Sequence, residues 1–213
     1  MGETIDLGHR VELVPMDPHF QNISIALYRQ ESGDGPVFQV QSYSKRDGTR
    51  QRMEFIARAM AVLGGMEPVG GETRKLRFPC HAEHLFACRR VFLEACKLDP
   101  NQPVEPRPLQ ILDKKSNRTV TVTRQSQGVY RLSADGEESD RASRIGAVAN
   151  GLLKLGQMQV VGSDSDSVGF GCGQPHDDLV GLLLVRALNV RAILREQEMT
   201  ASRGILSAPS AQK

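Results

Sequence analysis

The chain has 213 residues, of which 39% are hydrophobic and 24% charged, and its formal net charge is +2, as in an ordinary globular protein. So small a positive excess does not favour a nucleic-acid partner or attraction to a membrane surface. The longest apolar run, residues 179–185, is far too short to span a bilayer, so we expect no membrane association. The N-terminus lacks the pattern of a secretory signal, and four scattered cysteines do not form a disulfide scaffold. We therefore expect a cytoplasmic protein with reduced thiols.

The first half of the chain predicts three strands, a helix, a fourth strand and a second helix. Apolar and polar residues alternate in the strand candidates, which are residues 9–15, 23–30, 36–44 and 75–80. The first helix ends at Gly64, because glycine reaches the left-handed conformation that closes many helices. The second helix covers about residues 82–97.

The second half repeats this order. Its strand candidates are residues 108–114, 119–125, 128–134 and 167–172. Its first helix ends at Gly156, and its second helix covers about residues 175–196. Shifting the chain by 92 residues aligns the halves without a gap from Val37/Val129 to His84/His176. Eight of 22 positions are identical at the end of this stretch. They are Leu63/Leu155, Gly64/Gly156, Met66/Met158, Val69/Val161, Gly70/Gly162, Phe78/Phe170, Cys80/Cys172 and His84/His176.

The predicted fold class is α+β, with two tandem β-β-β-α-β-α repeats that originate from an internal duplication and are related by a pseudo-twofold axis. The strands are antiparallel, and the helices pack on one face of the sheet. The strands of the two repeats could form one continuous sheet or two separate sheets. The predicted domains are a first repeat at 1–98, a proline-rich linker at 99–107, a second repeat at 108–197 and a disordered tail at 198–213.

A short motif recurs where the fourth strand of each repeat gives way to a helix. Residues 77–84 read RFPCHAEH and residues 169–176 read GFGCGQPH, so both copies contain Phe-x-Cys-x3-His. Together, Cys80, His84, Cys172 and His176 supply the two thiolates and two imidazoles of a structural zinc site. Such a site requires the two junctions to meet at the pseudo-twofold axis, which the sequence does not show.

Two other interpretations of the motif compete with zinc. One is nucleophilic catalysis by Cys172, with His176 as its base and Asp177 or Asp178 orienting the histidine. The other is a packing junction that recurs because both repeats meet the same packing problem, and the sequence favours this one. On that interpretation the protein needs no cofactor, and zinc is the alternative.

A basic cluster, residues 45–52, lies at the start of the first predicted helix. Its arginines Arg46, Arg50 and Arg52 are candidates for binding an anion, because a helix N-terminus and guanidinium groups both favour phosphate. The equivalent segment of the second repeat, residues 137–144, contains several acidic residues. A solvated helix start is the simpler interpretation of both segments.

The identical positions are mostly residues that pack or turn, and few of them are chemically reactive. The sequence therefore favours a non-catalytic binding or assembly module over an enzyme, with a protein partner or a second copy of the chain as its partner. The alternatives are an enzyme or zinc-binding protein that uses the Cys/His pairs, and an anion or nucleic-acid binder that uses residues 45–52.

Overall fold

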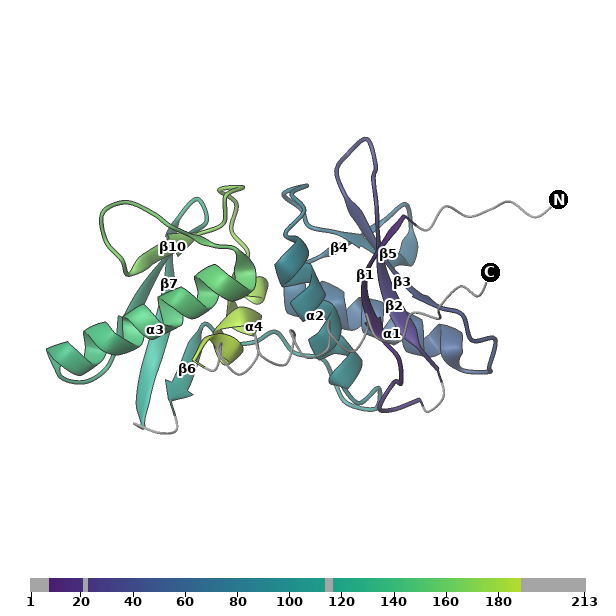
Figure 1. Cartoon of the computed structure of the whole chain (residues 1–213), viewed down its shortest axis with the longest axis horizontal. Helices are drawn as coiled ribbons and strands as arrows, with labels where there is room; N and C mark the ends of the chain where they lie inside the picture. Colours follow the sequence, from purple (N-terminus) through teal and green to yellow (C-terminus); the bar gives the residue numbers. More distant parts are fainter. Residues whose placement is uncertain (1–7, 21–22, 114–116, 189–213) are drawn as a thin grey trace, which may run out of the picture.

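The computed structural model describes residues 8–20, 23–113 and 117–188 (Figure 1). The predicted disordered tail at 198–213 lies outside the described residues, as does the last part of the helix predicted for 175–196. Within the part of the chain that is described, no helix combines the length and the apolar character needed to cross a membrane.

The N-terminal half is a five-stranded antiparallel sheet with two helices. Its strands run in the order β1-β2-β3-β5-β4. They are β1 (His9–Val14), β2 (Ile25–Gln30), β3 (Val37–Ser42), β4 (Glu67–Val69) and β5 (Glu72–Arg77). Helix α1 (Thr49–Gly64) follows β3, and helix α2 (Leu85–Lys97) follows β5.

The C-terminal half has the same element order and the equivalent strand order, β6-β7-β8-β10-β9. Its strands are β6 (Gln110–Asp113), β7 (Arg118–Ser126), β8 (Val129–Ala134), β9 (Gln159–Val160) and β10 (Ser167–Gly169). Helix α3 (Glu138–Gly156) follows β8, and helix α4 (Asp177–Ala187) follows β10. The predicted α+β class and the β-β-β-α-β-α order are therefore confirmed.

Each half contains one strand more than the sequence predicts. The segment that follows the predicted helix end at Gly64 contains the three residues of β4. The matching strand β9 has two residues. Alternation cannot be recognised over so few residues, and a proline such as Pro68 is tolerated because β4 is an edge strand.

The two sheets are separate, and the halves meet through their helices. Helix α2 lies beside α4 in the middle of the molecule, with one sheet on either side (Figure 1). Helix α1 also contacts α4, and α2 contacts α3. Exchanging α1 with α3 and α2 with α4 leaves this set of contacts unchanged, as the predicted pseudo-twofold axis requires.

One hydrophobic cluster extends through both halves. Each helix contributes an apolar stripe, for example Ile56 and Met60 in α1 and Val148 and Leu152 in α3, all fully buried. Because both sheets and all four helices contribute to this cluster, the two strand–helix junctions are held at fixed positions relative to each other.

Candidate metal centre

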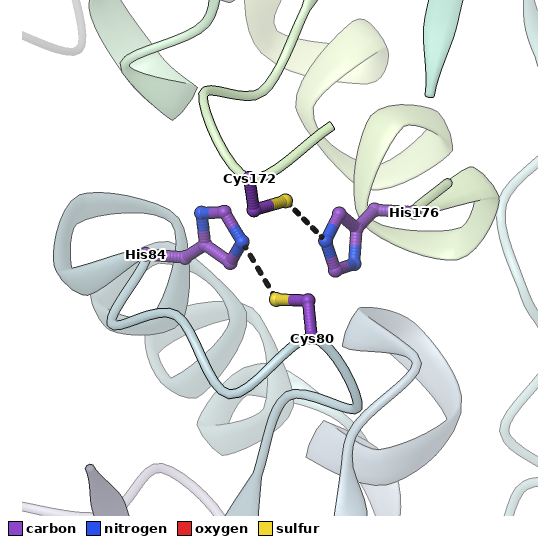
Figure 2. Close-up of side chains that lie close together, drawn as sticks. All are labelled: Cys80, His84, Cys172 and His176. Carbon is purple, nitrogen blue, oxygen red and sulfur yellow. Dashed lines mark hydrogen bonds between the residues drawn. The ribbon is translucent and has the colours of Figure 1, made fainter. Parts of the chain in front are cut away.

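The two Cys-x3-His motifs meet at the interface between the halves (Figure 2). One ligand atom from each of Cys80, His84, Cys172 and His176 lies within 4.8 Å of the other three. The Sγ atom of Cys80 lies 3.2 Å from Nε2 of His84, and Sγ of Cys172 lies 3.3 Å from Nε2 of His176. Each half therefore supplies one sulfur and one nitrogen.

The same local structure positions the cysteine in both halves. A tight turn follows β5 and β10, closed by hydrogen bonds from the His81 amide to the Phe78 carbonyl (2.9 Å) and from the Gly173 amide to the Phe170 carbonyl (3.0 Å). The cysteine lies inside this turn, two residues after the phenylalanine. The turn directs both thiols toward the other half of the molecule (Figure 2).

The histidines occupy the N-cap positions of α2 and α4. Neither side chain caps its helix. Instead, both imidazoles point into the cluster (Figure 2). His84 has φ 40° and ψ 42°, a left-handed conformation that is uncommon for a residue with a side chain and tends to occur at functional sites.

Two phenylalanine rings pack against the imidazoles of the cluster. The ring centroids of His84 and His176 are 4.7 Å apart. Phe170 packs edge-on against both imidazoles, at 4.9 Å and 5.1 Å, and Phe78 does the same at 5.1 Å and 5.9 Å. Both phenylalanines are buried. They come from the repeated motif, so each Phe-x-Cys-x3-His copy builds part of the apolar wall around the cluster.

The size of the cluster suits a tetrahedral ion. With Zn–S near 2.3 Å and Zn–N near 2.0 Å, the ligand atoms of a tetrahedral zinc site are about 3.3–3.8 Å apart. The two Cys–His separations are already this short, and the largest separation in the cluster is below 4.8 Å. Side-chain adjustments of about 1 Å would bring all four atoms to the distances of a zinc site.

Burial favours the neutral forms of Cys80, His84 and His176. It raises the pKa of the Cys80 thiol to about 11, and the neighbouring Cys172 thiol acts in the same direction. Burial and the adjacent His176 lower the pKa of His84 to about 4, and burial also lowers the pKa of His176. The histidines are thus neutral near pH 7, the form in which imidazole binds a metal ion.

The aspartates after His176 bind other groups. Asp177 accepts a hydrogen bond of 3.0 Å from the Tyr130 hydroxyl and pairs with Arg124 at 3.1 Å. The same hydroxyl accepts a 2.5 Å hydrogen bond from the His176 amide. Asp178 lies close to Gly65, at the end of α1. Asp177 therefore fixes the backbone of His176 through Tyr130.

The structure does not bring the arginines of the basic cluster to one point. Arg52 is buried and pairs with Asp17 at 3.0 Å, while the side chain of Arg50 is 81% exposed and pairs with Glu54 at 2.8 Å. Arg46 is exposed in the turn before α1. Two of the three anion candidates thus already have carboxylate partners within the chain.

The sequence interpretation did not include Tyr130 or Asp17. Tyr130 takes the place of Phe38 in the first half, and this extra hydroxyl was the available signal for the hydrogen bonds around His176. The sequence around Asp17 gave no sign that it is buried, because a single aspartate in a polar stretch resembles a solvated residue. The other two cysteines, Cys88 and Cys96, are buried in α2 as small core residues.

The comparisons with known proteins found no match for this chain: no protein-family model, no curated protein and no solved structure matches it.

Proposed function

We propose that the protein is a non-catalytic assembly module whose two halves are held together by one structural Zn²⁺ ion, bound by Cys80, His84, Cys172 and His176. The observation that carries the proposal is the convergence of four ligand atoms, two from each half, to within 4.8 Å. The two copies of the motif lie 92 residues apart in the sequence, so the cluster exists only when both halves are folded and docked.

The ligand chemistry supports zinc over other common ions. Thiolate sulfur and imidazole nitrogen are soft or borderline ligands, whereas Mg²⁺ and Ca²⁺ prefer oxygen. A ligand set of two sulfurs and two nitrogens is typical of structural zinc sites.

The number of ligands supports a structural role. A catalytic zinc ion usually has three protein ligands and a fourth position for water or substrate, whereas here four side chains each offer one ligand atom. A nucleophilic role for Cys80 is also disfavoured in the metal-free cluster, because its raised pKa opposes formation of the thiolate. On this proposal the protein does not use Cys172, His176 and Asp177 for catalysis.

The ion stabilises the docked arrangement of the halves. A structural metal contributes its binding free energy to folding, because the unfolded chain does not present a preformed site. The docked halves then present a single rigid body to a partner, which we propose to be another protein or a second copy of the chain.

The test is metal analysis of protein purified under reducing conditions and supplied with Zn²⁺. We expect about one zinc ion per chain, and its removal by a chelator should lower the melting temperature. The variants Cys80→Ser and Cys172→Ser should each lose the metal.

The two buried cysteines of helix α2 provide a matched control. Cys88→Ala and Cys96→Ala remove a buried thiol without touching the cluster and should retain about one zinc ion per chain. Substoichiometric zinc in the folded wild-type protein would show that the site is not a metal site. The same conclusion would follow if the variants Cys80→Ser and Cys172→Ser bound as much zinc as the wild type.

A further inference from the structure

We propose that the metal centre is a redox switch, in which a peroxide oxidises Cys80 and Cys172 to a disulfide between the two halves and thereby releases the ion. The inference rests on the proposed function, because it concerns the regulation of the same site.

The positions of the sulfurs support this pairing. Cys80 and Cys172 come from opposite halves, and their Sγ atoms are among the four that lie within 4.8 Å of one another. A disulfide requires an S–S distance of about 2.05 Å, so the sulfurs have to approach by less than about 3 Å. Both cysteines lie in turns between a strand and a helix, where side-chain rotation and small backbone shifts do not break a sheet or a helix.

Exposure distinguishes this pair from the remaining cysteines. Cys80 and Cys172 are only partly buried, whereas Cys88 and Cys96 are 0% and 2% exposed. A small oxidant therefore reaches the thiols of the cluster and is excluded from those of the α2 core. Both partners of the disulfide are thus present at the accessible site.

The chemistry needs only one equivalent of hydrogen peroxide. One thiolate of the pair attacks a peroxide oxygen, the O–O bond breaks, an S–O bond forms and hydroxide leaves, which gives a sulfenic acid. The second thiolate attacks that sulfur, the S–S bond forms, the S–O bond breaks and a second hydroxide leaves. The two sulfurs lose two electrons and the peroxide gains them.

Oxidation removes half of the ligands of the ion. His84 and His176 alone remain, and two neutral imidazoles hold zinc far more weakly than the complete Cys₂His₂ set. The new disulfide closes a loop between residues 80 and 172, so the halves exchange a metal link for a covalent one. The switch therefore releases zinc while the two halves stay joined.

The experiment starts from the full chain with its zinc content already measured. Hydrogen peroxide is added stepwise, released zinc is followed with a chromogenic chelator, and peptide mapping by mass spectrometry identifies each cysteine product. We expect one Cys80–Cys172 disulfide for each zinc ion released, while Cys88 and Cys96 stay reduced. A thiol reductant and added Zn²⁺ should restore the starting state.

Variants separate the switch from general damage. Cys88→Ala and Cys96→Ala should release zinc with the same peroxide dependence as the wild type. Because Cys80→Ser and Cys172→Ser leave one cluster thiol without a partner, a sulfenic acid should accumulate there and react with dimedone.

Failure of the proposed function and failure of the redox switch can be told apart. Protein without zinc before oxidation would contradict the proposed function. Zinc-loaded protein that yields sulfinic acids, disulfides between chains or unchanged thiols in place of the Cys80–Cys172 bridge would overturn the switch and leave the structural metal site standing.

Discussion

The two halves have an arginine at equivalent positions, Arg52 in α1 and Arg144 in α3, but its surroundings differ. Arg52 and its partner Asp17 are almost fully buried, and the guanidinium also donates to the carbonyls of Cys96 and Leu98 at the C-terminal end of α2. Arg144 has a partly exposed side chain and lies 3.5 Å from the exposed carboxylate of Asp140. Arg144 also lies 3.9 Å from Asp113. The first half thus uses this position for an almost fully buried ion pair, whereas the ion pairs of Arg144 are partly exposed.

A second difference lies beside the metal centre. Tyr130 and Asp177 form a hydrogen bond at the start of α4, where the first half has the apolar residues Phe38 and Leu85. By contrast, the Phe, Cys and His of the repeated motif are identical in both halves and meet at the interface. Similarity is thus retained where the halves contact each other symmetrically, and each half has its own interactions elsewhere.

The largest effect on stability should come from the buried arginine. Arg52→Met leaves the Asp17 carboxylate buried without its cation, so we expect a loss of about 3–5 kcal/mol in unfolding free energy. Arg144→Met should cost about 0–1 kcal/mol, because its ion pairs are more exposed. Urea unfolding of both variants measures the difference.

A double variant provides the control for this comparison. Asp17→Asn together with Arg52→Met removes the unpaired charge and should recover part of the loss. If Arg52→Met and Arg144→Met lowered the unfolding free energy by the same amount, burial would not distinguish the two arginines.

An intermediate effect is expected where α3 crosses α4. A Cβ atom added at Gly151 would lie 2.4 Å from the Ala187 carbonyl oxygen, so Gly151→Ala should push the helices apart and cost about 1–3 kcal/mol. The first half has Ala59 at the equivalent position, which shows that its helices leave room for the methyl group. Thermal unfolding compares the variant with the wild type.

The matched control is another glycine of the same helix. No atom lies within 4 Å of a Cβ added at Gly146, so Gly146→Ala should stabilise α3 by about 0.5–1 kcal/mol. If both alanines raised the melting temperature, the close approach of α3 and α4 at Gly151 would be wrong.

The smallest effect should come from an ion pair between the halves. Glu94 of α2 lies 2.9 Å from Arg186 of α4. Burial raises the pKa of Glu94, but its hydrogen bond to Arg186 and the charges of Arg186 and Lys97 outweigh burial and lower it below the ordinary value. A lowered pKa stabilises the fold above the unfolded-state pKa, near 4.3 for glutamate, and this contribution disappears as the pH falls through the folded-state pKa.

The variant Glu94→Gln tests this dependence. It should lower the unfolding free energy by up to about 1 kcal/mol at pH 7, and its difference from the wild type should shrink below about pH 4. Denaturant unfolding at several pH values measures this difference. A difference that does not change with pH would show that the charge of Glu94 does not stabilise the interface.

Much of the fold could be predicted from local sequence patterns. Alternating residues identified the long strands, and Gly64 and Gly156 lie in the last turn of α1 and α3, within one residue of the left-handed residues that close these helices. The strands β4 and β9 could not be predicted, because two or three residues carry no periodicity and form a strand only when they pair with a neighbour.

The candidate site, like the fold, could be predicted only in part. The sequence by itself determined the four residues and their Cys-x3-His spacing, because one turn and one helix start suffice to bring a cysteine close to the following histidine. It favoured a packing junction, and Phe78 and Phe170 do pack there. Only the tertiary structure decided that the two junctions meet, because this depends on how α2 and α4 pack across residues about 90 positions apart in the chain, and such long-range packing leaves no local pattern in the sequence.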